Sequence, residues 1–363
     1  MSRRIQMLRA VCAAVAALMA GCTVIPSLES DSPEEEIVRF YTDVKGDPSC
    51  SVACVREERA VFAGDPRALY RVGSLTKLFL RPAFSRLQED GVIDLDSPVT
   101  RCAPFSLPDE YTSVTLRDLM ENRSGLPREF LNPLNPLDAG RAFLSGVCGV
   151  SLYGGFETIP DFAEELRGWR ARWHVRAREP QYSNVGFALL ALSVENVAGR
   201  GLEEIFAERV ARPCGLADTV FVPSESQAGR VLPPCAGDLP WMYLRGSEVP
   251  EHPLGPALRG TGGLFSTAAD CARFFSGEWR YVDSLIAEKP LELCADLEDR
   301  GLLRVRLLMS GRRVLYRAGM IYGGASFVCF EPSSRTILVI LRNVTSWPSD
   351  DDFIFADRIS RGK

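Results

Sequence analysis

The sequence predicts an α/β protein in which both ends of the chain build one sheet and a helical region is inserted between them. Near the start, the strings SVACV and RAVFAG flank a charged turn and have the apolar, β-branched character of paired strands. Near the end, residues 302–343 hold four more strand-like runs, LLRVRLLMSG, RRVLYRAG, ASFVCFEP and TILVILRN. Between residues 101 and 258 helical patterns prevail and strand-like runs are scarce. A short helix from residue 37 and a last helix over 352–359 complete the expected sheet region.

Several helices can be placed individually. One begins near Ser74, because SLTKLFLRPAFSRLQEDG has apolar residues at helical spacing and ends on glycine. Pro82 inside it predicts a kink, since proline removes a backbone donor and clashes with the preceding turn. Thr267 and Asp270 (TAAD) form a capping-box pattern at the start of another helix. In the inserted region, helices are expected over 115–122, 159–173, 183–199 and 202–212.

The N-terminal residues are expected to be a targeting segment outside the fold. Three arginines and no acidic residue precede the apolar run AVCAAVAALMA, which ends before Cys22. The run is about half of the roughly 20 residues that a membrane-spanning helix needs, so a permanent span is disfavoured. LMAGC resembles a bacterial lipobox, with Met19 in place of the usual leucine, and this implies lipidation of Cys22. Plain secretion with cleavage near Ala20 is the alternative.

The stretch after Cys22, TVIPSLESDSPEEE, is polar, acidic and proline-containing, which suits a flexible tether. A lipid-anchored protein of the bacterial cell envelope, facing outside the cytoplasm, is therefore expected.

The chain is expected to divide into domains, and substrate clefts tend to form at domain boundaries. The expected domains are a signal peptide (1–21), a tether (22–36), an α/β domain (37–100 and 259–363) and a helical domain (101–258).

Composition excludes several classes of function. The 363 residues are 46% hydrophobic and 25% charged, as in an ordinary globular protein. A net charge of −5 provides no positive field for a phosphate backbone, so no nucleic-acid partner is expected. His174 and His252 cannot build a three-histidine site, and the 11 cysteines include no CxxC pair. No metal is therefore expected.

The cysteines are expected to be mostly buried thiols. Without Cys12 and Cys22 their number is odd, so at least one stays free or pairs between molecules. Cys148 and others in apolar runs suit the role of small buried hydrophobes. Cys50 and Cys54 are not expected to form a disulfide, because four residues along a strand separate them by roughly 13 Å.

Two short motifs carry the candidate chemistry. Ser74 and Lys77 form S-x-x-K at a helix start, and this spacing puts hydroxyl and amine on one helical face. A desolvated neutral amine can take the proton of a serine nucleophile, although a surface serine and lysine would give the same pattern. Tyr182 and Asn184, in QYSN before an apolar helix, could point into a cleft. The alternative is an N-cap at Ser183 with the tyrosine in the core.

The order and surroundings of these motifs resemble the serine β-lactamase and penicillin-binding protein superfamily, most closely its class C and D-stereospecific peptidase branch. This resemblance implies a β-lactamase/transpeptidase-like fold with a mainly antiparallel sheet flanked by helices. Similarity runs from about residue 50 to 343. The segments that carry it are RVGSLTKLF, LQEDGVIDLDSPV, VTLRDLMENRSGLP, YSNVGFALLALSVENVAGRGLEEIFAERVARPCGLADT and GTGGLFSTAADCARF.

The resemblance also implies a role for each motif residue. Ser74 would be the nucleophile that forms an acyl-enzyme, and Lys77 would help to deprotonate it. Tyr182 would act as a general base or as a proton shuttle to the leaving group, and Asn184 would hydrogen-bond the substrate's amide side. The backbone amide of Ser74 and one from the strand after a third motif would form the oxyanion hole. This chemistry needs no metal or other cofactor.

The third motif departs from the family pattern of K-T-G, H-T-G or H-A-G. Its best match is Arg317, Ala318 and Gly319, just before the final hairpin, with Met320 supplying the second oxyanion amide. Arginine binds carboxylates bidentately but cannot deprotonate. The missing threonine hydroxyl weakens the case for recognition of a β-lactam carboxylate. The GTG string at 260–262 is rejected as this motif, because it leads into the capping-box helix.

Smaller departures leave the catalytic groups in place. Asn122 stands where the family loop usually has histidine, and residues 179–181 (EPQ) replace the proline and glycine expected before YSN. No GxSxG nucleophile elbow occurs. His174 and His252 are expected to be solvent or structural histidines and not the base of a triad.

Two hypotheses for function follow. The first is a serine hydrolase acting outside the cytoplasm on peptides, D-amino acid amides or esters, with peptidase or esterase activity favoured over β-lactamase activity. Its partners would be a small-molecule or peptide substrate and a membrane reached through the lipid anchor. The alternative is a catalytically impaired lipoprotein that keeps the fold as a binding or structural module.

Overall fold

The computed structural model describes residues 32–57, 59–129, 158–169, 181–235, 254–346 and 348–361. The predictions for the signal peptide and for residues 22–31, 148, 174, 179–180 and 252 lie outside these ranges.

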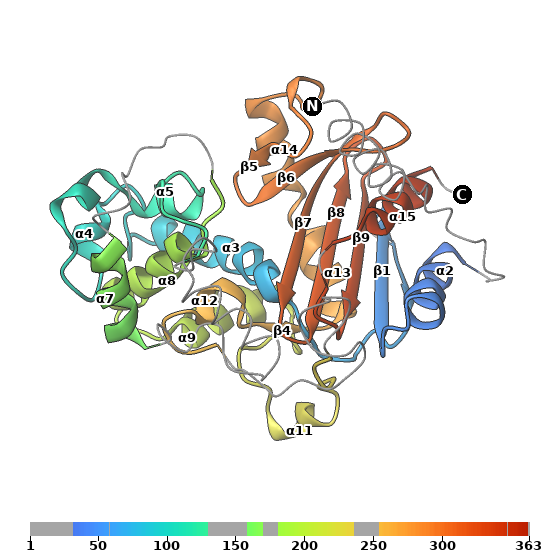
Figure 1. The fold of residues 1–363 in the computed structure, drawn as a ribbon, viewed down its shortest axis with the longest axis horizontal. Coiled ribbons are helices and arrows are strands. Elements are labelled where there is room, and N and C mark those ends of the chain that lie inside the picture. Colours follow the sequence, from blue (N-terminus) through green and yellow to red (C-terminus); the bar gives the residue numbers. More distant parts are fainter. Residues whose placement is uncertain are drawn as a thin grey trace, which may run out of the picture.

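A seven-stranded antiparallel sheet forms the centre of the molecule (Figure 1), in the order β2-β1-β9-β8-β7-β6-β5. The first strands pair with the last, since Cys50 faces Arg342 across β1 and β9, so both ends of the chain build one sheet. This confirms the predicted α/β fold with a mainly antiparallel sheet. A small second sheet pairs β3 (Tyr70–Arg71) with β4 (Phe265–Ser266). The large sheet contains β1 (Cys50–Arg56), β2 (Arg59–Ala63), β5 (Asp299–Arg300), β6 (Leu303–Leu307), β7 (Arg313–Ile321), β8 (Gly324–Glu331) and β9 (Thr336–Arg342).

Helices cover both faces of the sheet and form a separate group to one side (Figure 1). On one face α2 contacts β1 and α15 contacts β9, and on the other face α13 contacts both strands. The helical elements are α2 (Pro33–Arg39), η1 (Phe40–Val44), η2 (Gly73–Leu75), α3 (Thr76–Glu89), α4 (Val99–Cys102), η3 (Asp109–Ser113), α5 (Leu116–Met120), α7 (Ile159–Trp169), α8 (Asn184–Ala198), α9 (Leu202–Phe206), η4 (Ala207–Ala211), α10 (Arg212–Cys214), α11 (Glu225–Ala228), α12 (Arg259–Gly262), α13 (Ala268–Ser276), α14 (Trp279–Glu288), η5 (Leu291–Leu293) and α15 (Asp350–Ser360).

Two hydrophobic clusters lie on opposite sides of the sheet. The terminal-helix cluster packs side chains of α2, η1 and α15 against the sheet and includes Ile37, Phe40 and Phe355. The larger helical-side cluster reaches from Val55 on β1 to the helices around α8. One continuous core therefore links the two predicted domains, and the boundaries at 100/101 and 258/259 stay predictions.

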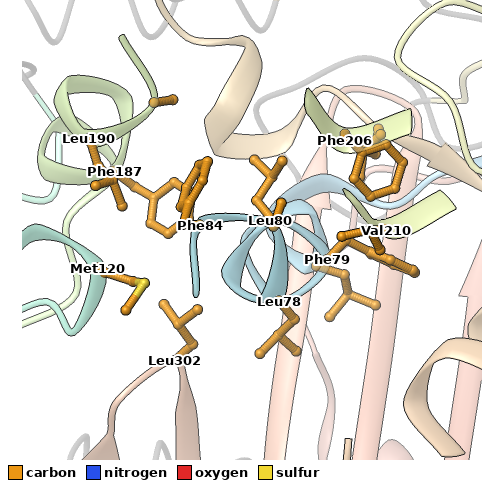
Figure 2. Packing of buried hydrophobic residues seen from close by; sticks show 14 of the residues in the cluster. Leu78, Phe79, Leu80, Phe84, Met120, Phe187, Leu190, Phe206, Val210 and Leu302 are labelled. Atoms are coloured by element: carbon orange, nitrogen blue, oxygen red, sulfur yellow. The ribbon is translucent and has the colours of Figure 1, made fainter. Parts of the chain in front are cut away.

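Helix α3 runs through the middle of the helical-side cluster (Figure 2). Phe84 packs near Phe187 of α8, with ring centroids 6.1 Å apart, and Phe79 meets Phe206 of α9 at 6.4 Å. Burial of each such side chain contributes about 1.5–3 kcal/mol. The helix continues unbroken across Pro82. This packing fixes the helix that begins directly after Ser74.

Two local predictions require correction. Helix α2 begins at Pro33 after an N-cap at Ser32, so residues 33–36 are helical and not part of a flexible tether. Their three glutamates lie in the first turn, where the helix dipole favours negative charge. The capping box at Thr267 is only half formed, since Thr267 Oγ1 accepts from Asp270 N at 3.1 Å. The Asp270 carboxylate instead accepts from Asp218 N and Thr219 Oγ1.

The cysteine predictions for the described residues are confirmed. Cys50 and Cys54 are free thiols on the same strand, and Cys329 is free and buried. Among the described residues, no single helix is long and apolar enough to cross a membrane, whereas the bent pair 184–198 and 202–214 passes that test of length and composition.

Candidate active site

The S-x-x-K motif lies where the helical group meets the sheet. Ser74 is in the middle of η2, and Lys77 follows in the first turn of α3. Lys77 Nζ lies 3.3 Å from Ser74 Oγ, as the helical spacing predicts. Ser74 Oγ also lies 2.7 Å from the Tyr182 hydroxyl, so the two motifs that the sequence singled out meet at one oxygen.

Lys77 is fully buried and surrounded by oxygen acceptors. Its Nζ donates to Asn184 Oδ1 at 2.7 Å and to the Thr261 carbonyl at 2.6 Å. Burial lowers the pKa of this amine, and the charge of Arg317 lowers it further, against an opposing effect of Tyr182. A lowered pKa makes the neutral amine, the form that can accept the serine proton, available at lower pH.

Helix α8 positions Tyr182 and Asn184 through its N-cap. Ser183 Oγ accepts from Gly186 N at 2.8 Å and donates to the Pro127 carbonyl at 2.6 Å. Ser183 is therefore an N-cap, as the alternative interpretation of QYSN predicted. The Tyr182 hydroxyl nevertheless faces Ser74, so this tyrosine does not simply pack in the core. The two interpretations of QYSN hold together, because a capped helix start fixes the residues on either side of it.

Asn122, the first departure from the family loop, holds that loop against the QYSN segment. Its φ is +58°, a left-handed conformation that asparagine tolerates better than most residues. Its Oδ1 accepts from Ser183 N at 3.1 Å, and its Nδ2 donates to the Gly301 carbonyl at 3.2 Å. Its own carbonyl accepts from Gln181 N at 2.7 Å. Asparagine here serves both the backbone conformation and the support of Tyr182.

Arg317 of the third motif stacks on Tyr182. Its guanidinium carbon lies 3.9 Å from the ring centroid, and the side chain is buried. Burial alone would raise the pKa of Tyr182, but the charges of Lys77 and Arg317 and the hydrogen bonds to Lys77 and Ser74 outweigh it, so this pKa is lowered. The phenolate form of Tyr182 is therefore easier to reach in this site than that of a buried tyrosine without cationic neighbours.

Strand β7 presents this motif to the pocket because its neighbour β6 is shorter. The last β6 pair is Arg304 with Tyr316, and residues 317–321 pair only with β8. The motif therefore lies on a free edge.

The GTG string at 260–262 forms part of α12 and not a strand, as expected from its rejection as the third motif. The Thr261 carbonyl within this string accepts a hydrogen bond from Lys77. Sequence reasoning missed that contact.

Two glycines allow η2 and β7 to approach each other. A Cβ on Gly73, whose φ is +49°, would lie 2.9 Å from Met320 N. A Cβ on Gly319 would meet the Val72 carbonyl oxygen and lie 2.9 Å from Ser74 N. Ser326 Oγ donates to the Val72 carbonyl at 2.7 Å and ties η2 to β8. The backbone amides of Ser74 and Met320 thus come from segments in direct contact, as two oxyanion donors require.

Ser74 opens onto a pocket of about 460 Å³. Its wall includes Glu129, which sequence reasoning missed, although a carboxylate two residues after the SGLP string was a possible signal. Asn184 Nδ2 donates to Glu129 Oε1, and Asn184 Oδ1 accepts from the Tyr182 hydroxyl at 2.9 Å. The predicted residues that line this pocket are Ser74, Tyr182, Asn184, Arg317, Gly319 and Met320.

This fold and this arrangement of motifs are those of the serine β-lactamase and penicillin-binding protein superfamily. Residues 41–360 match the sequence profile of the family described as Beta-lactamase, and the chain belongs to that family. The members of this family are serine hydrolases with carboxypeptidase or β-lactamase activity.

Individual relatives are more distant. The chain is 28% identical over 217 residues to the D-alanyl-D-alanine-carboxypeptidase/endopeptidase AmpH of Escherichia coli K12, which covers 57% of this chain and 48% of that protein. The chain thus spans about half the length of this curated relative. The octameric penicillin-binding protein homologue from Pyrococcus abyssi superposes with a TM-score of 0.67 at 20% identity, over 89% of this chain and 75% of that one. A class C β-lactamase from Rhodobacter sphaeroides gives 0.64 at 15% identity, over 89% and 97%.

Proposed function

We propose that the protein is a serine hydrolase that forms an acyl-enzyme at Ser74 and acts on peptides, D-amino acid amides or esters. The observation that carries this proposal is the hydrogen-bonded group of Ser74, Lys77 and Tyr182, in which both partners of the serine oxygen have lowered pKa values. A nucleophile beside two such bases is the arrangement that covalent acyl transfer needs.

In this mechanism Ser74 Oγ gives its proton to the neutral amine of Lys77 or to the Tyr182 phenolate while it attacks the substrate carbonyl. The oxyanion that forms accepts hydrogen bonds from the amides of Ser74 and Met320. Tyr182 then passes a proton to the leaving amine or alcohol as its bond to the carbonyl carbon breaks. Water hydrolyses the acyl-enzyme with the same groups as base.

Peptidase or esterase activity ranks above β-lactamase activity in this proposal. Ala318 stands where a threonine hydroxyl usually completes the third motif. The curated name of the Escherichia coli relative describes a carboxypeptidase and endopeptidase, which supports a peptide substrate.

The test is intact-mass spectrometry after incubation with penicillin, a fluorophosphonate and a p-nitrophenyl ester. We expect an adduct on the wild type that is absent from Ser74→Ala and retained by Ser284→Ala, whose exposed serine donates to the Tyr281 carbonyl. An adduct with penicillin would indicate recognition of lactams or peptides, whereas reaction with the p-nitrophenyl ester would indicate esterase chemistry. A folded wild type that no reagent modifies would contradict the proposal and favour the binding-module alternative.

We also propose, from the sequence alone, that residues 1–21 are removed and that Cys22 carries the lipid anchor of an envelope protein. Cys22→Ala should move the protein from the membrane fraction to the soluble fraction of a bacterial host. A variant that stays in the membrane fraction would contradict the anchor.

A further inference from the structure

The turn between β7 and β8 follows directly after the residue that supplies the second oxyanion amide. Met320 is the last residue but one of β7, and it pairs with Ala325 of β8 across this turn. Gly323 lies in the turn with a φ of +67°, and its backbone amide donates to Thr345 Oγ1 at 2.8 Å. The Met320 amide is thus only three residues from a hydrogen bond to a side chain outside the hairpin.

Thr345 is itself held in place from a third segment of the chain. The residue is buried, and its hydroxyl donates to the Cys235 carbonyl at 3.1 Å. The Thr345 amide donates to the same carbonyl at 2.9 Å, and the Cys235 amide donates to the Asn343 carbonyl at 3.1 Å. The hydroxyl therefore bridges two backbone groups, one fixed beside β9 and the other in the β7–β8 turn.

The same hairpin packs against the segment that leads to Ser74, the source of the first oxyanion amide. A Cβ on Gly324 would meet the Arg71 carbonyl oxygen. Ser326 Oγ donates to the Val72 carbonyl at 2.7 Å. A shift of the turn would therefore change the separation between the amides of Ser74 and Met320, and donors to an oxyanion are effective only when both are aligned.

We propose that Thr345 is a positioning residue for the oxyanion hole, because its hydroxyl holds the β7–β8 turn so that the Met320 amide stays aligned with that of Ser74. The inference rests on the proposed function, which gives these two amides their role. A hydroxyl suits the position because it accepts and donates at once. Valine has the same shape but would leave the buried Gly323 amide without this acceptor.

The test uses a pair of esters that report on the oxyanion hole in particular. In p-nitrophenyl thionoacetate, sulfur replaces the carbonyl oxygen of p-nitrophenyl acetate, and sulfur accepts hydrogen bonds only weakly. The ratio of kcat/KM for the two esters is measured for the wild type, Thr345→Val, Thr345→Ser and Thr336→Val. Thr336 is the matched control, since it is a buried threonine at the other end of β9 whose Oγ1 accepts from Arg56 Nε at 3.2 Å.

We expect the wild type to prefer the oxygen ester, and Thr345→Val to lower kcat/KM for that ester about tenfold or more with little change for the thiono ester. Thr345→Ser keeps the hydroxyl and should restore the wild-type ratio, and Thr336→Val should leave it unchanged. A Thr345→Val variant that loses activity equally on both esters, or on neither, would overturn the proposal, because the hydroxyl would then not act through the oxyanion amides.

Urea unfolding of each variant separates an effect on the site from loss of the fold. If Thr345→Val does not fold, Thr345→Cys takes its place, because a thiol is a weak acceptor on a side chain of similar size. If neither variant folds although Thr345→Ser does, the hydroxyl supports the fold as a whole and the proposal is overturned.

The wild type distinguishes failure of this inference from failure of the proposed function. A wild type that is acylated at Ser74 but shows no preference for the oxygen ester would overturn the inference and leave the proposed function standing. A folded wild type that reacts with neither ester and that the fluorophosphonate leaves unmodified would overturn the proposed function, and with it the reaction to which Thr345 contributes.

Discussion

At the scale of single residues, the geometry of the site depends on a few residues whose size or backbone conformation fixes a backbone contact. Gly319 is one of these, because a Cβ there would meet the Val72 carbonyl and lie 2.9 Å from Ser74 N. Asn122 is another, since it combines a positive φ with two side-chain hydrogen bonds. Neither residue reacts in the proposed mechanism, yet each places atoms that do.

Gly319→Ala should therefore impair acylation much more than it impairs folding. The added methyl group pushes β7 away from η2 and separates the two oxyanion amides, and we expect labelling of Ser74 by a fluorophosphonate to slow about 100-fold. Stability should fall by about 1–3 kcal/mol, which urea unfolding measures. Gly229→Ala is the control, because its φ is −68° and no atom lies within 4 Å of the added Cβ. Equal labelling rates for the two variants would contradict this account.

The lowered pKa of Lys77 predicts the direction of the pH dependence. The amine accepts the serine proton only when neutral, so acylation should rise with pH. Because burial lowers this pKa, the rise should come at lower pH than for an exposed lysine, whose pKa is about 10.4. The measurement is the rate of fluorophosphonate labelling against pH.

Arg317→Gln supplies the control for this pH dependence. The positive charge of Arg317 lowers the pKa of both Lys77 and Tyr182, so its removal should move the midpoint to higher pH. A midpoint that stays in place, or moves to lower pH, would show that these amine and phenol groups do not control the step.

At the scale of elements, the sequence predicted the helices and strands better than the tertiary contacts between them. The strands, α8 and the capped helix starts follow from periodicity and capping residues, which are local signals. The contact of Lys77 with the Thr261 carbonyl joins residues 184 positions apart, and the bond from Asn184 to Glu129 spans 55. No local pattern encodes such contacts, because tertiary packing determines them. The prediction that residues 33–36 belong to the tether failed for a related reason, since α2 is stabilised by its packing on β1.

The pairing of the N-terminal helical segment with α15 is itself testable. Tyr41 of η1 donates its hydroxyl to Asp352 Oδ1 at 2.5 Å, and burial raises the pKa of that carboxyl. Tyr41→Phe removes a hydrogen bond to a buried charged group and should cost about 1.5–3 kcal/mol in urea unfolding. The pocket is on another part of the sheet, so labelling of Ser74 in the folded variant should match the wild type. A cost below about 0.5 kcal/mol, typical of a neutral surface change, would count against this role.

At the scale of the whole molecule, the two hydrophobic clusters share the strands that separate them. Along β1, Val52 and Cys54 belong to the terminal-helix cluster, whereas Ala53 and Val55 belong to the helical-side cluster. Successive side chains of a strand point to opposite faces, so loss of either cluster exposes the other side of the same backbone. The sequence predicted this sheet correctly because its strands are contiguous apolar runs. It could not show that one core would join the two predicted domains.

We therefore expect the two clusters to unfold together, and the buried cysteines can report it. Cys50, Cys54 and Cys329 lie in the terminal-helix cluster, and Cys102, Cys271 and Cys294 lie in the helical-side cluster. Pulsed alkylation at increasing urea, mapped by peptide mass spectrometry, should modify both groups over one range of concentration. Cys214, which is half-buried, should react earlier and serves as the control for reagent access. Modification of one group at clearly lower urea than the other would mean that the shared strands do not couple the two faces, and that the molecule unfolds in separate parts.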